Sequence, residues 1–246
     1  MAKSVRLDQA LVQRGLFPSR HQAQAAIMAG EVRIDDRVAG KASDSVHEGN
    51  EITVAARRRY VGRGGLKLEG ALAYFGIVCE GKTALDIGAS TGGFTDCLLQ
   101  KGAGKVFAVD VGHGQLAWKI RDDARVIVLE KTNARRLTRE EVPDPIDICV
   151  IDVSFISLTL ILPSAFELLT SNGVILALIK PQFELAREEV SRGGVVRAAE
   201  LHEKAQQKIV AFADTIGARV EGLVSSNITG ADGNQEFFIF LRKPSA

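Results

Sequence analysis

The sequence predicts a doubly wound α/β domain with a seven-stranded, mostly parallel sheet, preceded by a small α+β domain. Three observations in the 246-residue chain lead to this fold class. From residue 66 onward, apolar runs typical of buried strands alternate with amphipathic segments typical of helices. The first of these runs, 83–87, ends in a glycine-containing loop that passes into a helix. Residues 1–56 differ, because two short helix patterns there precede several short strand patterns.

The small domain, 1–56, begins with two helices. The first is expected at 6–14, and the second starts at a capping box formed by Ser19 and Gln22 and ends at Gly30. The short strands that follow are expected at 32–34, 37–38 and 51–54. Residues 57–65 combine four arginines with three glycines, so we expect a basic, hinge-like linker there.

The large domain, 66–246, begins with an amphipathic helix that contains Lys67. Its strands are expected at 83–87, 106–109, 126–129, 146–151, 174–179, 220–224 and 236–241. Further helices are expected at 94–99, around Trp118, at 163–169 and at 199–216. The run 146–151 is apolar except for Asp147, as in a parallel strand buried on both faces, whereas the last strand should run antiparallel. The loop 182–197 is long enough to be a lid or a substrate clamp.

The charge of the chain is unevenly distributed. Residues 1–69 contain 12 Lys or Arg and 8 Asp or Glu, a balance of +4, and the remainder contains 19 and 22, a balance of −3. These sum to the net charge of +1. A basic first part favours a polyanionic partner, although an ordinary solvated surface explains so small an excess nearly as well.

Composition also limits the compartment and the partners. No apolar run has the length of a transmembrane helix, and residues 1–6 lack the apolar core of a signal peptide. The cysteines, Cys79, Cys97 and Cys149, lie in apolar contexts without the spacing of metal ligands. We therefore expect buried thiols in a reducing cytoplasm, no membrane partner and no metal site. The sequence leaves the oligomeric state open.

The glycine-containing loop at 88–93 reads GASTGG, and several kinds of site use such a loop. A dinucleotide site has the spacing G-x-G-x-x-G, and a phosphate-binding loop has a lysine after its glycines, so neither fits. Residues 88–92 do match the G-x-S-x-G nucleophile elbow of α/β-hydrolases, which also needs an acid and a histidine downstream. Only His113 and His202 follow, and His202 falls in an ordinary amphipathic helix pattern.

The loop fits better with class I methyltransferases, which bind S-adenosylmethionine (SAM). Asp110 supports this interpretation, because it ends the next strand, where a carboxylate can accept both ribose hydroxyls of an adenosine. The alternative is a structural glycine turn with a solvated Asp110. The candidate SAM-binding residues are Asp86, Gly88, Ser90, Gly92, Gly93, Phe94, Asp110, Val111 and Asn133.

Three segments of the small domain together resemble the S4-like RNA-binding domain. They are SVRLDQAL at 4–11, SRHQAQA at 19–25 and GEVRIDDRV at 30–38. The resemblance implies that the small domain binds RNA, and a helical oligomerisation module is the alternative. The candidate RNA-binding residues are Arg6, Arg14, Arg20, Arg33, Arg59 and Arg63.

Four ionisable residues are expected at sheet edges, where folding does not require a charge. Asp152 and Lys180 end adjacent central strands, Lys67 lies on the helix before the first strand, and Glu236 begins the last strand. They match, one by one, the Lys-Asp-Lys-Glu tetrad of FtsJ-like ribose 2′-O-methyltransferases. With its S4-like start, nearly the whole chain resembles the TlyA family, whose members were historically labelled haemolysins. The resemblance implies a SAM-dependent methyltransferase acting on a cytidine 2′-hydroxyl in small-subunit or large-subunit ribosomal RNA (rRNA), or in both.

The resemblance also implies a role for each member of the tetrad. Burial favours the neutral form of an amine, so Lys180 is the candidate base that accepts the hydroxyl proton. Asp152 would position Lys180 and interact with the incoming methyl group. Lys67 and Glu236 would orient the ribose and the base through hydrogen bonds. The alternative is a set of two structural ion pairs.

Other functions remain open at this point. Base-N methyltransferases have Asn/Asp-Pro-Pro-Tyr/Phe where this chain has DVSF at 152–155, and cytosine-C5 enzymes need a Pro-Cys nucleophile that is missing. A non-catalytic RNA-binding or ribosome assembly factor would bind SAM without methyl transfer. A membrane-lytic haemolysin would need a secretion signal, a spanning segment or a strongly basic amphipathic helix, none of which we recognise. The sequence does not indicate which nucleotide is modified, or whether free rRNA, a subunit or the ribosome is the substrate.

Overall fold

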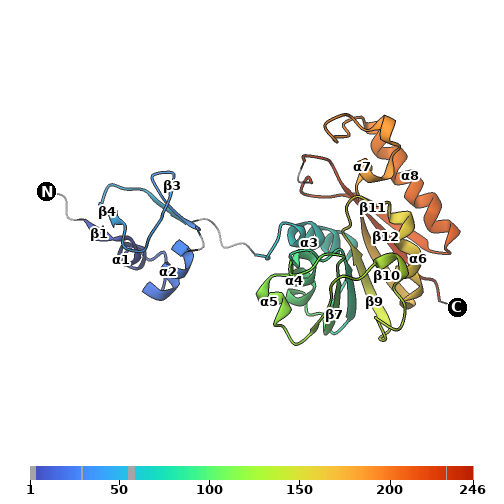
Figure 1. Ribbon diagram of the computed structural model, residues 1–246, viewed down its shortest axis with the longest axis horizontal. Coiled ribbons are helices and arrows are strands. Elements are labelled where there is room, and N and C mark those ends of the chain that lie inside the picture. The colour runs from blue at the N-terminus through green and yellow to red at the C-terminus, as the bar shows by residue number, and fades with distance from the viewer. Residues whose placement is uncertain (1–3, 29, 55–58, 231, 246) are drawn as a thin grey trace. The chain divides into compact units, whose positions relative to one another are not determined.

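The structure is a computed structural model that describes residues 4–28, 30–54, 59–230 and 232–245. The chain divides into two compact units, Met1–Arg58 and Arg59–Ala246 (Figure 1). Of the linker expected at 57–65, residues 57 and 58 lie outside the described residues. Residues 59–65 belong to the second unit, where Tyr60 is buried and helix α3 begins at Gly64. These residues pack into the unit because the Tyr60 ring lies directly over Gly65.

The N-terminal unit contains two helices and two small antiparallel sheets. Its elements are β1 (Val5–Arg6), α1 (Leu7–Gln13), α2 (Arg20–Met28), β2 (Val32–Ile34), β3 (Arg37–Val38), β4 (Ser45–Val46) and β5 (Ile52–Val54). The predicted helices and strands are present, and Ser19 Oγ accepts the predicted bond from the Gln22 amide at 3.3 Å. Strands β1 and β4 were not predicted, because a pair of two-residue strands leaves no periodic pattern. The core includes Leu7, Leu11, Ala23, Ile27 and Val32.

The sheet of the second unit has seven strands in the order β11-β12-β10-β9-β6-β7-β8. They are β6 (Thr83–Ile87), β7 (Lys105–Val109), β8 (Val126–Leu129), β9 (Ile146–Ile151), β10 (Leu169–Ile179), β11 (Arg219–Ser225) and β12 (Phe237–Arg242). Strands β10, β9, β6, β7 and β8 pair in parallel, and β12 pairs antiparallel with β10 and β11. The predicted seven-stranded, mostly parallel sheet is confirmed, including its antiparallel last strand.

Helices cover both faces of this sheet (Figure 1). The helices are α3 (Gly64–Phe75), α4 (Gly93–Gln100), α5 (Trp118–Arg121), α6 (Leu162–Glu167), α7 (Pro181–Glu184) and α8 (Ala199–Thr215). Three short 3-10 helices are η1 (Ala134–Arg136), η2 (Leu158–Leu160) and η3 (Arg187–Glu189). The apolar residues of α3, α4 and α5 pack on one face, and those of α6 and α8 pack on the other.

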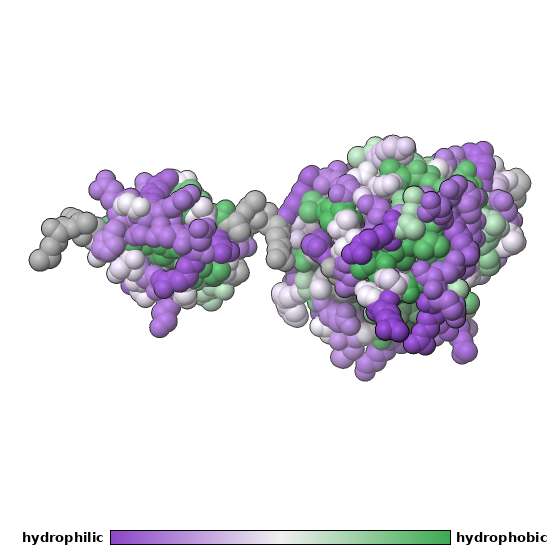
Figure 2. All heavy atoms as spheres, turned by 90° about the horizontal axis from the view of Figure 1, so that it is seen from above, coloured by the Kyte–Doolittle hydropathy of each residue, from purple (hydrophilic) through white to green (hydrophobic). Residues whose placement is uncertain are grey.

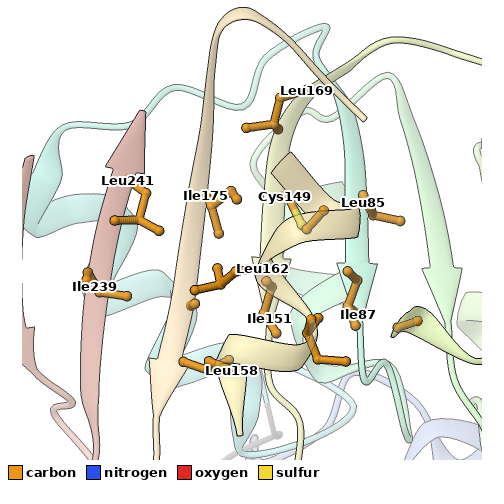
Figure 3. Packing of buried hydrophobic residues seen from close by; sticks show 14 of the residues in the cluster. Leu85, Ile87, Cys149, Ile151, Leu158, Leu162, Leu169, Ile175, Ile239 and Leu241 are labelled. Atoms are coloured by element: carbon orange, nitrogen blue, oxygen red, sulfur yellow. The ribbon is translucent and has the colours of Figure 1, made fainter. Parts of the chain in front are cut away.

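Successive residues of each strand point to opposite faces, which produces one apolar cluster on each face. In β6, Leu85 and Ile87 join the cluster under α6 and α8, whereas Ala84 joins the cluster under α3 and α4. Figure 3 shows the first cluster, where Cys149 and Ile151 of β9 lie beside the two β6 side chains. Strand β9 is therefore buried on both faces, as its mostly apolar sequence predicted. All three cysteines are buried free thiols, as expected.

Several element ends differ from the prediction. Strand β10 begins at Leu169 rather than at 174, because it continues through an irregular stretch at 170–173. Asn172 in that stretch has a left-handed φ of 64°, a conformation that the sequence pattern does not reveal. Helix α6 correspondingly ends at Glu167. The loop expected at 182–197 contains most of α7 and all of η3, so it is less irregular than predicted.

Hydrophilic residues cover most of the visible face of each unit (Figure 2). Within the ranges that the structure describes, no helix combines the length and the apolar character needed to cross a bilayer.

Candidate active site

Three residues of the predicted tetrad, Asp152, Lys180 and Glu236, lie at one edge of the sheet, where β6, β9 and β10 end and β12 begins. The strand pairing brings them together, because Ile87 pairs with Ile151 and Ile179 pairs with Phe237. The residues next to these four positions are Gly88, Asp152, Lys180 and Glu236. This is the edge at which open α/β sheets bind their ligands.

Lys180 and Asp152 form an ion pair at this edge. Lys180 Nζ lies 2.7 Å from Asp152 Oδ1 and donates a hydrogen bond to Ser154 Oγ at 2.9 Å. The Lys180 side chain is 11% exposed and the Asp152 side chain 21% exposed. A single amine is thus held between a carboxylate and a hydroxyl, and the carboxylate stays partly open to a ligand.

Lys67 and Glu236 form a second, more deeply buried ion pair. Lys67 Nζ lies 2.5 Å from Glu236 Oε2, and the two side chains are 8% and 3% exposed. The loop at Gly230 closes over the carboxylate, since a Cβ at Gly230 would lie only 2.6 Å from Glu236 Oε1. The structure therefore brings all four residues of the predicted tetrad to one sheet edge as two ion pairs.

A pocket of about 410 Å³ opens at the carboxyl ends of β6, β7 and β9. Its lining includes Asp152 and five of the predicted SAM-binding residues. The five are Gly88, Ser90, Asp110, Val111 and Asn133. Apolar side chains of Val153, Ile156 and Ile161 complete the wall. A mostly apolar wall with a few convergent polar groups is typical of a small-molecule site.

A smaller pocket of about 160 Å³ adjoins the first and shares Gly88, Ser90 and Asp152 with it. Residues 62–64, which were predicted to be part of the linker, form one of its walls, together with Gly93 and Phe94. Gly64 permits this close packing, because a Cβ there would lie 3.2 Å from the Phe94 ring and 3.8 Å from Asp152 Oδ2.

Asp110 is fixed by backbone amides at the mouth of the larger pocket. Its Oδ2 accepts a bond from the Ser90 amide at 2.8 Å, and its Oδ1 accepts one from the Gly112 amide at 2.7 Å. A carboxylate oxygen can accept more than one hydrogen bond, so both oxygens keep capacity for ligand hydroxyls. Asn133 accepts a bond from the Arg135 amide at 3.1 Å through Oδ1, which leaves its amino group as a donor.

Two glycines of the loop have positive φ angles but different neighbours. Gly88 has a φ of 85°, and a Cβ there would lie 2.4 Å from the Asp152 carbonyl oxygen, so no larger residue fits. Gly92 lies at the start of α4, has a φ of 93° and faces Leu116. Gly92 lines neither pocket. Its structural role is thus to turn the chain into α4.

Asp86 lies beneath the loop rather than in a pocket wall. Its side chain is fully buried, lines neither pocket, and accepts a bond from Thr95 Oγ1 at 2.6 Å. Burial raises the pKa of the Asp86 carboxyl to about 7; the Thr95 hydrogen bond opposes the shift, and the nearby carboxylates of Asp152 and Asp110 add to it. Asp86 was predicted to bind SAM, and the structure does not place it in reach of either pocket.

Phe155 is a pocket residue that the sequence did not reveal. It lines the larger pocket, its side chain is 90% exposed, and its φ is 64°. Its ring centroid lies 5.0 Å from that of Phe183, which follows Lys180 on α7. A bulky residue in the left-handed region is strained, and such strain occurs often at functional sites. Other lining residues that were not predicted are Gln115, Thr132, Ser154 and Ile156.

The predicted RNA-binding arginines of the N-terminal unit have different partners. Arg14 donates to backbone carbonyl groups of the 47–50 segment, and Arg33 donates to the Asp36 carbonyl. These two side chains hold turns of the unit. Arg6 and Arg20 instead share one buried carboxylate, that of Asp8.

The two predicted RNA-binding arginines of the second unit also differ. Arg59 pairs with Glu69 at 2.7 Å. Arg63 is exposed and lines the smaller pocket. Of these two, only Arg63 therefore lies at the active-site edge.

The hydrolase alternative lacks its histidine in the structure. Ser90 Oγ lies 3.5 Å from Gln115 Oε1, and His113 Nδ1 lies 2.9 Å from Glu130 Oε2. No histidine lines either pocket that contains Ser90. Across the described parts of the chain, no group of three or more His, Cys, Asp or Glu side chains is arranged to hold a metal ion.

Comparison with known proteins gives two family matches. The model of the FtsJ-like methyltransferase family matches residues 60–243, and the model of the S4 domain matches residues 5–52. The 16S/23S rRNA (cytidine-2′-O)-methyltransferase TlyA of Mycobacterium tuberculosis is 45% identical, over 98% of this chain and 91% of the relative.

Solved structures agree with these matches. A Streptococcus thermophilus protein named as a hemolysin is 43% identical, with a TM-score of 0.75 over 99% of this chain and 90% of its own. An S-adenosylmethionine-dependent methyltransferase from Listeria monocytogenes is 15% identical, with a TM-score of 0.56 over 75% of this chain and all of its own. At that identity the second likeness concerns the fold alone.

Proposed function

This chain belongs to the TlyA family of FtsJ-like methyltransferases, and we propose that it methylates a cytidine 2′-hydroxyl of rRNA with SAM as the methyl donor. One observation carries the proposal. Two lysine–carboxylate pairs, each with a buried lysine, lie at the same sheet edge, and Asp152 of one pair lines both adjoining pockets.

The two adjoining pockets fit the two halves of SAM. The larger pocket offers the Asp110 carboxylate for ribose hydroxyls, the Asn133 amino group for adenine, and the apolar Val111 and Ile156 side chains for the ring faces. The smaller pocket, between residues 62–64 and the glycine loop, would take the methionine half. The halves meet at Gly88, Ser90 and Asp152, so the transferable methyl group would lie beside Asp152.

Bound SAM supplies an electrophilic methyl group. The protein must then orient a ribose hydroxyl and remove its proton as the new bond to oxygen forms. In its neutral form, Lys180 can accept that proton at Nζ, and Asp152 and Ser154 hold the amine in place. Positioning of the hydroxyl relative to the methyl group supplies much of the remaining rate enhancement.

The second ion pair and an exposed ring complete the proposed site. Lys67 and Glu236 are buried deeply enough to keep a fixed orientation, so they can hold the ribose through hydrogen bonds. Phe155 exposes its ring at the larger pocket, where it can stack on an unpaired base. The target nucleotide would therefore have to leave its base-paired position.

The N-terminal unit would supply RNA affinity, and the substrate would be rRNA in the cytoplasm. Arg6 and Arg20 on this unit and Arg63 beside the smaller pocket expose guanidinium groups that can contact phosphates. Phosphate contacts orient a protein on RNA, and base contacts then select the nucleotide.

The proposal is tested with labelled SAM and separately purified small and large ribosomal subunits. We expect label in the rRNA of at least one subunit, at the 2′-oxygen of a cytidine, and little label with Lys180→Ala. SAM binding without any methyl transfer would instead indicate a non-catalytic assembly factor. Release of haemoglobin from erythrocytes by the purified protein, without methyl transfer, would support the haemolysin reading.

A further inference from the structure

The N-terminal unit holds two arginines on one buried carboxylate. Asp8, in the first turn of α1, is fully buried. Arg6 donates from Nε to Asp8 Oδ1 at 3.1 Å and from Nη2 to Oδ2 at 3.2 Å. Arg20 Nη2 and Gln24 Nε2 each donate to Oδ2 at 2.8 Å. The carboxylate therefore joins the start of α1 to two residues of α2.

Both arginines keep N–H donors that the Asp8 carboxylate does not use. Their side chains are 46% and 51% exposed, although the carboxylate between them is buried. A guanidinium has five N–H donors. Arg6 uses two of them on Asp8 and Arg20 uses one, so three and four donors remain without a partner among the residues that the structure describes. The pair can therefore bind a second anion without releasing the first.

The Asp8 carboxylate stays ionised in this arrangement. The Arg6 hydrogen bond holds the pKa of Asp8 well below its usual range; burial opposes the shift, and the bonds from Arg20 and Gln24 add to it. The cluster thus has two positive charges and one negative charge over the whole pH range in which RNA binding is measured. Its excess charge is positive and faces solvent through the two guanidinium groups.

Arg14 and Arg33, by contrast, donate to backbone carbonyls and fix turns. Only Arg6 and Arg20, among the arginines described in this unit, are ion-paired to a side chain that is itself inaccessible to solvent. A buried carboxylate that orients two half-exposed guanidinium groups restricts their rotamers before any ligand arrives. Side chains ordered in advance lose less freedom on binding.

We propose that Asp8 is a positioning residue for RNA, which fixes Arg6 and Arg20 as a preformed pair that binds a backbone phosphate. The planar guanidinium fork matches the geometry of phosphate oxygens, so a fixed pair gains in both affinity and orientation. This inference rests on the proposed RNA-binding role of the N-terminal unit.

The test asks whether RNA affinity rises or falls when an acidic residue of this unit is replaced. Asp8→Asn and Asp36→Asn each remove one negative charge from the same unit. The Asp36 carboxylate is exposed and makes no hydrogen bond or ion pair with any residue in the described ranges, which makes it the matched control. Electrostatic attraction alone predicts that both substitutions tighten RNA binding. If Asp8 positions the two arginines, Asp8→Asn should weaken RNA binding about tenfold, whereas Asp36→Asn should leave RNA binding unchanged or tighter.

The measurement is binding of the full-length chain to purified ribosomal subunits at several salt concentrations. Thermal unfolding of each variant shows whether the N-terminal unit remains folded. If Asp8→Asn unfolds it, Arg6→Lys and Arg20→Lys provide the test, because lysine keeps the charge but lacks the fork. Positioning predicts that each lysine variant binds about as weakly as the corresponding alanine variant.

Two results would overturn the inference: unchanged or tighter binding by folded Asp8→Asn, or wild-type affinity of the lysine variants. Failure of the underlying RNA-binding role has a different signature. In that case the double variant Arg6→Ala/Arg20→Ala would itself bind the subunits as tightly as the wild type.

Discussion

Lys180 Nζ contacts Asp152 on one side and Ser154 on the other, so the same amine could serve methyl transfer in two ways. It could accept the proton of the ribose hydroxyl, or it could remain charged and orient that hydroxyl. The two roles differ in the substitution that they tolerate, because arginine keeps the charge but does not lose its proton in proteins.

We expect Lys180→Ala to slow methyl transfer by roughly 10²–10⁴-fold, the usual contribution of a positioned general base. Lys180→Arg should be about as slow, and both variants should bind SAM and RNA nearly as the wild type does. Single-turnover methylation and calorimetry with SAM check these expectations. Activity of Lys180→Arg near that of the wild type would leave Lys180 an orienting cation.

The buried Asp86 predicts an unusual dependence of stability on pH. Its pKa is raised from an ordinary carboxyl value to about 7, so the folded protein keeps a proton that the unfolded chain has lost. The free energy of unfolding should therefore fall as pH rises from about 4 to about 7, by up to the order of 4 kcal/mol, and level off above that.

Asp86→Asn should remove this dependence, because an amide can accept the Thr95 bond without ionising. Urea unfolding of both proteins at several pH values tests this. The variant should gain stability relative to the wild type as pH rises through the interval. Parallel curves for the two proteins would mean that Asp86 is ionised throughout.

At the residue scale the structure brings the predicted tetrad together more completely than the predicted cofactor-binding residues. Asp152 and Lys180 follow apolar strands, so the general rule for the edges of α/β sheets places them together. Asp86 precedes the glycines by two residues, yet its side chain points to the α4 face of the sheet and is buried. Phe155 could not be predicted from the sequence, because a phenylalanine does not indicate a left-handed backbone conformation.

At the scale of the elements, α7 and α8 are joined to the loop after β9 through one carboxylate. Glu184, whose side chain is 1% exposed, accepts bonds from Ser157 Oγ at 2.5 Å, the Leu158 amide at 2.8 Å and Lys208 Nζ at 3.0 Å. This carboxylate connects the two loops that follow Asp152 and Lys180. It should therefore stabilise the geometry of the active-site edge.

Glu184→Ala should lower the free energy of unfolding by about 3–5 kcal/mol, since it leaves buried donors without a partner. Glu184→Gln keeps an oxygen that can accept the bonds from the Ser157 hydroxyl and the Leu158 amide. Its free energy of unfolding should therefore fall less. Lys208→Met, which removes the half-exposed partner, is the matched control and should have the smallest effect. Chemical denaturation ranks the three variants, and equal stabilities would show that the carboxylate has no clamping role.

The periodic patterns predicted which elements exist more reliably than where they end. The mostly apolar runs of β6 and β9 located the centre of the sheet, because burial on both faces favours apolar residues at most positions. The start of β10 was missed by five residues, since the strand continues through polar residues and Gly173. The packing of residues 59–65 was not predicted either, because a sequence does not distinguish glycines that permit close packing from glycines of a hinge.

At the scale of the whole molecule, the two units have separate apolar cores. Deletion of residues 1–58 should therefore leave the second unit folded and SAM binding nearly unchanged. Affinity for ribosomal subunits should fall, and its dependence on salt should become weaker, because fewer phosphate contacts release counterions. Binding titrations at several salt concentrations test this. An unchanged affinity would mean that the S4 unit does not contact the RNA.

The antiparallel β12 has a consequence for the order in which the active site is completed. Glu236 pairs with Lys67 across 169 positions of sequence, whereas the residues of both pockets and the Lys180–Asp152 pair all precede β12. During translation, at about 5–20 residues per second, the residues that line the two pockets are all made seconds before Glu236. The buried Lys67–Glu236 pair is therefore completed only by the final strand, after every residue of the two pockets has been made.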